Sequence, residues 1–258
     1  VNEGVADVRL IRSDKMNALD DRMFNALIEA GNTVSKMADV RVVVLSGEGR
    51  AFCAGLDMGN FANMAGGEKS DVQRHPLAVR THGVANKPQK AVWVWRECPV
   101  PVIAAVHGVA FGGGFQLALG ADMRIVHPDT KMSVMEIKWG LIPDMAGTAI
   151  MPSLAREDVV RELTYTGRVF SGVEAQNYGF ATRVVDDPHT EAMSIAKEIA
   201  LKSPDAIKAA KRMYENLQGM TPTQALLQES EEKDQIIGRA NQIEAVMSSL
   251  EKRKANFT

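Results

Sequence analysis

The sequence is short of cysteine, of long apolar runs and of any excess of charge. Its 258 residues include 2 cysteines, 30 basic side chains and 32 acidic ones. The balanced charge argues against nucleic acid or an anionic membrane as a partner. No run approaches the roughly 20 apolar residues of a membrane span, and the first residues lack the basic and apolar parts of a signal peptide. We therefore expect a cytoplasmic protein with one large domain, or one domain and a small appendage.

Motifs for metals, nucleotides and serine nucleophiles are also absent. Cys53 and Cys98 are too far apart for a metal knuckle and lie among apolar neighbours, which favours buried, reduced thiols. The histidines form no HExxH pair, so no metal site is expected. Neither GxxxxGK[ST] nor GxSxG occurs in the chain. The sequence therefore gives no support for a phosphate-binding loop of that kind or for a serine hydrolase.

Strands alternate with helices over the first two thirds of the chain. Partly alternating or continuous apolar runs predict strands at residues 4–12, 40–46, 101–106, 121–126 and 131–134. Asp20 or Asp21 could cap a helix that runs to about Met37. Residues 58–92 carry glycines, prolines and charges without a period, which is typical of loops and loose helix. The alternation predicts an α/β fold.

The last third of the chain is predicted to be helical. Ser171 and Glu174 match the capping box of a helix that is expected to end at Gly179. Three further helices are expected to begin where a capping residue precedes a proline, at Asp187-Pro188, Ser203-Pro204 and Thr221-Pro222. The second of these helices should run to about Gln218 and the third to about Ile237. A helical tail after an α/β core suits docking or oligomerisation.

Residues 107–147 carry the strongest chemical signal. Gly112, Gly113 and Gly114 follow a predicted strand and open a helix, so their backbone N–H groups can face an anion. Glu136 lies in an apolar segment, where burial would raise its pKa toward values useful for proton transfer. Asp144 follows a proline, which also suits an ordinary turn. A surface Glu136 paired with Lys138 or Arg156 is the alternative.

Taken together, several segments resemble the enoyl-CoA hydratase/isomerase (crotonase) superfamily. They follow the family's order and span nearly the whole chain: residues 17–19, 51–57, 101–116, 121–122, 136–147 and 251–257. The resemblance implies a spiral of ββα units over residues 1–197. It also implies a C-terminal helical region, residues 198–258, that builds homotrimers or hexamers. The substrate would be an acyl-CoA thioester, with coenzyme A as part of the substrate and no separate cofactor.

The same resemblance assigns the binding residues. The backbone N–H groups of Leu56 and Gly113 would hold the thioester oxygen, because an enolate is best stabilised by preorganised donors. The loop from Ala54 to Asp57 would contact the adenine of coenzyme A, and Lys252 would contact one of its phosphates. Residues 58–98 would line the acyl pocket, with four candidates: Met58, Met64, Trp93 and Trp95.

The acid and base positions distinguish three functions. Typical hydratases of the family have glutamates at the positions of Gln116 and Glu136, but an amide cannot exchange protons near neutrality. Glu136 with Asp144 instead resembles the proton-shuttling pair of dienoyl-CoA isomerases, which is our leading hypothesis, although that subfamily has a third acid at the position of Gln116. The alternative is a hydratase in which Glu136 acts as acid and base and Gln116 orients water. The third hypothesis is a non-catalytic acyl-CoA binder.

Overall fold

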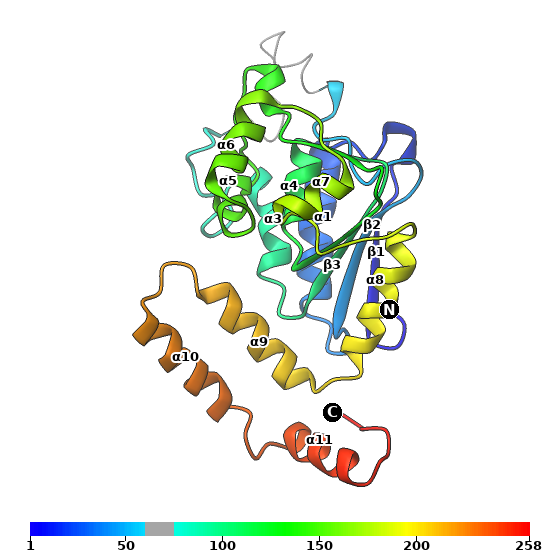
Figure 1. Ribbon diagram of the computed structural model, residues 1–258, viewed down its shortest axis with the longest axis vertical. Coiled ribbons are helices and arrows are strands. Elements are labelled where there is room, and N and C mark those ends of the chain that lie inside the picture. The colour runs from blue at the N-terminus through cyan, green and yellow to red at the C-terminus, as the bar shows by residue number, and fades with distance from the viewer. Residues whose placement is uncertain (60–74) are drawn as a thin grey trace.

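The computed structural model describes residues 1–59 and 75–258 (Figure 1). The predicted pocket residue Met64 lies outside the described residues. A five-stranded parallel sheet has the order β1-β2-β3-β5-β7. The strands of this sheet are β1 (Val5–Leu10), β2 (Val42–Gly47), β3 (Val102–Val106), β5 (Met123–Val126) and β7 (Arg183–Val184). The predicted α/β class is confirmed, and each predicted strand is present.

The central strands are buried on both faces, as their unbroken apolar runs predict. On β2, Val43 and Leu45 belong to the main core, while Val42 and Val44 face a second apolar cluster on the opposite side. Helix α8 (Pro188–Ala200) covers that second side with a row of alanines. Helices α1 and α3 lie on the other side of the sheet (Figure 1). The sheet therefore sits between two layers of helix, and its strand ends lead to the loops of the site.

Helix α1 (Asp21–Val34) begins where the sequence indicates, because the Asp20 side chain accepts a hydrogen bond from the N–H of Met23. Helix α3 (Lys87–Arg96) was not predicted from the sequence. It starts with a capping box between Asn86 and Gln89 and has a proline in its first turn. Its buried face packs into the core, so part of the segment expected to be irregular is an ordinary helix.

A smaller pair of strands, β4 (Val109–Phe111) and β6 (Lys131–Ser133), frames the helix that opens at the triple glycine, α4 (Gly113–Leu119). The chain then forms a 3₁₀ helix, η3 (Glu136–Trp139). Three α-helices follow along the chain, α5 (Gly147–Ile150), α6 (Glu157–Thr166) and α7 (Gly172–Tyr178). The predicted capping box at Ser171 and the stop at Gly179 are confirmed.

Three C-terminal helices extend away from the sheet (Figure 1). They are α9 (Pro204–Asn216), α10 (Pro222–Asp234) and α11 (Ala240–Leu250). Asp187 and Thr221 cap their helices as predicted, but Ser203 does not, because no hydrogen bond from its side chain closes the start of α9. The predicted boundary between residues 197 and 198 falls inside α8; the division into two domains stays a prediction.

A buried lysine ties α9 to the α/β core. Lys211 donates to the carbonyl oxygens of Trp95 and Val100, at 3.1 and 3.0 Å, and lies 2.8 Å from Asp122 Oδ2. The same oxygen of Asp122 accepts a hydrogen bond from the N–H of Val102. A buried ammonium is tolerated only when it is paired and hydrogen-bonded. These contacts fix where α9 leaves the core.

Within residues 1–59 and 75–258, every helix is too short or too polar to cross a bilayer.

Candidate active site

The triple glycine lets α4 start in close contact with neighbouring backbone. A Cβ on Gly114 would lie 2.1 Å from the carbonyl oxygen of Cys53, which no side chain allows. Gly112 has φ +50°, and a Cβ there would lie 3.3 Å from Glu136 Oε1. Glycine is required for the close approach at 114 and for the left-handed conformation at 112. The start of α4 is thereby pressed against the loop after β2 and against the Glu136 carboxyl group.

The loop that carries Leu56 contacts the start of α4, where Gly113 lies. A Cβ on Gly55 would lie 3.7 Å from the Gly113 nitrogen, so the two loops are in contact. The loop after β2 is held by Leu19, whose N–H donates to Gly55 O at 2.8 Å, while Asp57 N–H donates to Leu19 O. Within the described chain, neither the Leu56 nor the Gly113 N–H donates to a backbone acceptor. A pair of free donors of this kind suits a developing oxyanion.

Glu136 is a buried carboxyl group beside these donors, at the first residue of η3. The surface ion pair with Lys138 or Arg156 is therefore excluded. Its Oε1 accepts a hydrogen bond of 2.6 Å from Gln116 Nε2. Its Oε2 is buried without a hydrogen-bond partner among the described residues. Burial, assisted by the negative charge of Asp144, raises the pKa of Glu136 above its ordinary value, although the bond from Gln116 opposes that rise.

Asp144 lies in the turn between η3 and α5. Asp144 as a whole residue is exposed to solvent. The protein around its carboxyl group nevertheless desolvates that group and raises its pKa above the ordinary value. The next residue, Met145, is buried, and Ala146 has φ +69°, an unusual conformation for a residue with a Cβ. The backbone that follows Asp144 is therefore held in a specific conformation. Because Asp144 contributes to the pKa of Glu136, the two carboxyl groups are electrostatically coupled.

Gln116 lies on the buried face of α4 and connects both carboxyl-bearing segments. Its Oε1 accepts hydrogen bonds from the N–H groups of Met145 and Gly147, at 2.9 Å each. Its Nε2 donates to Glu136. The sequence marked Gln116 as the unexpected residue of the site but did not indicate these partners. Met145 and Gly147 carried no signal in the sequence, because they take part through backbone groups.

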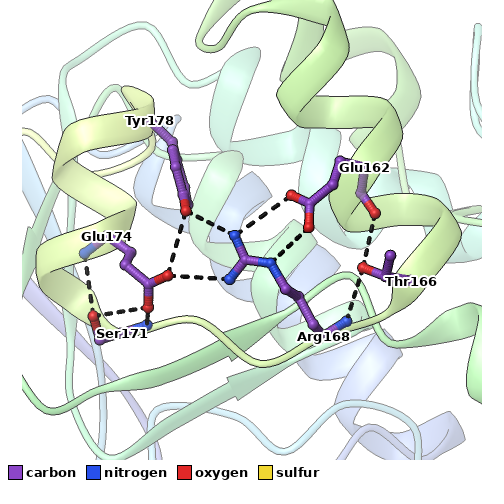
Figure 2. A network of polar contacts seen from close by, with 6 residues as sticks. All are labelled: Glu162, Thr166, Arg168, Ser171, Glu174 and Tyr178. Carbon is purple, nitrogen blue, oxygen red and sulfur yellow. Dashed lines mark hydrogen bonds and ion pairs between the residues drawn. The ribbon is translucent and has the colours of Figure 1, made fainter.

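A polar network braces the strand that leads to Glu136. Figure 2 shows Arg168 between Glu162, Glu174 and Tyr178, with Arg168 Nε 2.7 Å from Glu162 Oε1 and Nη2 2.7 Å from the tyrosine hydroxyl. The neighbouring Gly167 carbonyl accepts a hydrogen bond of 2.8 Å from the Ser133 hydroxyl on β6. The network therefore fixes the loop that holds the end of β6, just before η3 begins.

The residues expected to contact coenzyme A are only partly brought to the site. Ala54 and Asp57 lie on the loop that carries Leu56, but Asp57 is already paired with Arg12, at 2.7 Å. Burial works to raise the pKa of Asp57, but hydrogen bonds from the Gly59 N–H and from Arg12 lower it below the ordinary value. Lys252 is exposed beyond α11, and α11 lies at the opposite end of the molecule from α4 (Figure 1).

Three of the four candidates for the acyl pocket lie in the described residues, and they differ in burial. Trp95 lies on α3 and is fully buried in the hydrophobic core, so its predicted role in a pocket is wrong. Trp93 is half-buried and packs against the same core, while Met58 is exposed. Both thiols, Cys53 and Cys98, are buried and free, as predicted. Within the described parts of the chain, no group of three or more His, Cys, Asp or Glu side chains is placed to hold a metal ion.

Comparison with known families gives a match over the full length. A family model described as enoyl-CoA hydratase/isomerase matches residues 1–258. The mitochondrial Delta(3,5)-Delta(2,4)-dienoyl-CoA isomerase of Homo sapiens is 34% identical over 212 residues. That match covers 80% of this chain and 64% of the human protein, so the chain spans less than two thirds of this relative.

Other relatives match over a greater length. A probable enoyl-CoA hydratase of Bacillus subtilis (strain 168) is 29% identical over 253 residues, which cover 97% of this chain and 94% of that protein. Among solved structures, an enoyl-CoA hydratase from Bacillus anthracis superimposes with a TM-score of 0.89 at 29% identity. This superposition covers 98% of this chain and 95% of the other. The fold and the sequence therefore point to the same family.

Proposed function

Because the chain belongs to the enoyl-CoA hydratase/isomerase family, we propose that it isomerises dienoyl-CoA thioesters by proton transfer. The observation that carries this proposal is the position of two carboxyl groups: Glu136 is buried against Gly112 with its Oε2 unpartnered among the described residues, and Asp144 lies in the turn between η3 and α5. The pKa of each group is raised by desolvation. Proton transfer near neutral pH requires groups whose pKa values lie close to the working pH. The similarity of the chain to the dienoyl-CoA isomerase of Homo sapiens also favours this proposal.

The reaction moves one proton and two double bonds. In a 3,5-dienoyl thioester, one carboxylate removes a proton from C2, and the negative charge spreads over the conjugated chain to the thioester oxygen. The N–H groups of Leu56 and Gly113 stabilise that oxygen. The second carboxyl group returns a proton at C6, which leaves double bonds at C2 and C4. Glu136 borders Gly112, next to the Gly113 donor, so we assign it to C2 and Asp144 to C6.

The segment between the two carboxyl groups offers an exposed apolar surface for an acyl chain. Ile137, Trp139, Leu141 and Ile142 are all exposed between Glu136 and Asp144. A contiguous exposed apolar stretch next to a candidate site is typical of ligand or protein contact. The fatty acyl part of the substrate would lie along this stretch, while the loop at Ala54 would contact the adenine of coenzyme A.

The test is incubation with a 3,5-dienoyl-CoA while the absorbance of the conjugated 2,4-diene is followed. We expect the wild-type protein to form the product and both Glu136→Gln and Asp144→Ala to lose it. No absorbance change, together with rapid hydration of crotonyl-CoA, would refute the isomerase proposal.

A hydratase is the second candidate, favoured by the Bacillus subtilis relative, whose match covers nearly all of both chains. Glu136 would then act as acid and base, with its unpartnered Oε2 facing the water. In that case Glu136→Gln abolishes water addition, whereas Asp144→Ala leaves most of it. Tight acyl-CoA binding without turnover of any acyl-CoA tested would instead indicate a non-catalytic binder.

Self-association is proposed on the evidence of the C-terminal helices. No residue of α10 is buried, and apolar side chains of α10, α11 and the turn between them are exposed, namely Leu226, Leu227, Ile237, Ile243, Val246, Met247 and Leu250. We expect a homotrimer or hexamer, measured by light scattering of the full chain. Lys252 could contact coenzyme A only in such an assembly, because α11 lies far from α4 in one copy (Figure 1). A monomer in solution would contradict both expectations.

A further inference from the structure

Gln116 has no role in the isomerisation as described, yet it is the most fully engaged side chain of the site. It is completely buried. Its amide makes one bond to Glu136 and two bonds to the turn that follows Asp144, all at 2.9 Å or less. A side chain that orients a water molecule needs a free polar group directed at that water. The carbonyl oxygen of Gln116 already accepts two hydrogen bonds from backbone N–H groups, and its NH₂ group already donates a hydrogen bond to Glu136.

The orientation of this amide is dictated by its neighbours. The backbone nitrogens of Met145 and Gly147 can only donate, so the atom that faces them must be the acceptor oxygen of Gln116. The NH₂ group is thereby turned toward Glu136. A donor on that side favours the ionised form of a carboxyl group, and it satisfies Oε1 while leaving Oε2 without a partner among the described residues.

We propose that Gln116 is a positioning residue for proton transfer: its amide holds Glu136 with Oε2 free to act as the base, and it fixes the turn that carries Asp144. The inference rests on the proposed function, because it assigns the geometry of the same two carboxyl groups. One neutral side chain thus links the group that takes the proton to the segment that returns it.

The neutrality of the amide has a chemical consequence. A carboxyl group at position 116 would still accept the N–H groups of Met145 and Gly147, and those two bonds favour its ionised form. Two carboxylates at 2.6 Å cannot both be ionised, so the proton between them would stay on Glu136. Glu136 would then begin the reaction as an acid instead of a base. The amide at 116 therefore leaves Glu136 available as the base.

The test is the pH dependence of kcat/KM for the isomerisation in Gln116→Glu. We expect the acidic limb of the profile to move to higher pH by about one unit or more, because the base form of Glu136 becomes harder to reach. The matched control is Gln176→Glu, the same change at an exposed position on α7, whose profile should overlay that of the wild type. Overlay of the Gln116→Glu profile with the wild type would overturn the inference.

A second variant covers the case in which Gln116→Glu does not fold. Gln116→Met removes the bonds to both segments and preserves the approximate shape. We expect kcat to fall by about 10²-fold, which is the effect of a small displacement of reacting groups, while KM stays close to the wild-type value. A KM that rises as far as kcat falls would indicate loss of substrate binding and would refute a positioning role.

A substrate-free measurement separates this inference from the proposed function. Infrared difference spectra against Glu136→Gln follow the ionisation of Glu136 directly. If Glu136 titrates at higher pH in Gln116→Glu but the wild type does not isomerise dienoyl-CoA, the inference on Gln116 holds and the isomerase proposal fails. If the wild type isomerises dienoyl-CoA and the titration of Glu136 is the same in both proteins, the inference on Gln116 fails alone.

Discussion

The substitution Glu136→Gln should inactivate the protein and stabilise it at the same time. The glutamate is buried, and one of its carboxyl oxygens has no hydrogen-bond partner among the described residues. Such a group is costly to the folded state when it is ionised. A glutamine has nearly the same shape and can still accept the hydrogen bond of Gln116 through its own oxygen. The charge is removed while the packing is kept.

The pH dependence of this effect follows from the raised pKa of Glu136. The folded protein binds the proton of Glu136 more tightly than the unfolded chain, whose glutamate titrates near its ordinary pKa of 4.5. As the pH rises from that value to the higher pKa of the folded state, the unfolded chain has lost more protons, so the stability of the wild type decreases. The stability gain in Glu136→Gln should therefore be absent at low pH and reach its full value above the folded pKa.

The size of the gain is set by the cost of burying an ionised oxygen without a hydrogen-bond partner. A buried polar group without a partner costs about 1–3 kcal/mol. Since the glutamine leaves a neutral N–H₂ group in its place, we expect the lower end of that range. For a protein of this size, about 1 kcal/mol raises the melting temperature by about 2–4 °C. The activity should fall by about 10²–10⁴-fold, the usual contribution of an acid–base group.

The assay is thermal unfolding from pH 4 to pH 9 at one fixed protein concentration, because association also shifts the melting temperature. Isomerisation of a 3,5-dienoyl-CoA is measured on the same samples. A melting temperature of the variant below that of the wild type at high pH would refute the reasoning. A gain that is equal at all pH values would also refute it, because the effect would then not come from the charge of Glu136.

Three further predictions follow from the same contacts. Asp144→Asn should keep acyl-CoA binding, measured by calorimetry, while isomerisation falls by about 10²-fold or more, because an amide cannot return a proton. Gly114→Ala should prevent folding or lower the melting temperature strongly, since the new Cβ would lie 2.1 Å from the carbonyl oxygen of Cys53; an unchanged melting curve would contradict the close approach. Lys211→Met should cost about 3–5 kcal/mol in urea unfolding, because the Asp122 carboxylate loses its cation and two carbonyl oxygens lose the ammonium donor; a loss below about 1 kcal/mol would show that this pair does not hold α9.

The parts of the fold that depend on residues close together in the sequence could be predicted well. The β-branched run before Gly47 indicated a doubly buried strand, and β2 is such a strand. The capping box at Ser171 and the cap at Asp187 are both present. The same reasoning missed α3, whose capping box at Asn86 lies inside a stretch that was judged by its prolines and charges. It also predicted the start of α9 at Ser203-Pro204 correctly, but the Ser203 side chain forms no capping hydrogen bond there.

The site was predictable in its members but not in their connections. The triple glycine, Glu136 and Asp144 were identified from the sequence, and the structure places the first two in contact. Trp95 was misplaced, because an apolar residue in a helix gives no sign of whether it faces the core or a pocket. Lys252 was expected near the coenzyme, and a single copy of the chain places the neighbouring helix α11 at the opposite end from α4 (Figure 1).

The sequence by itself determined the α/β class, the family and the residue types available for chemistry, because these follow from local periodicity and from short motifs. Only the tertiary structure decided what Gln116 does. Its three bonds join α4 to η3, to the turn before α5 and to the first residue of α5, segments that meet only when the chain has folded. Two of those bonds use backbone N–H groups, which every residue except proline carries and which therefore leave no trace in a sequence. The burial that raises the pKa of Glu136 is likewise a property of the whole fold.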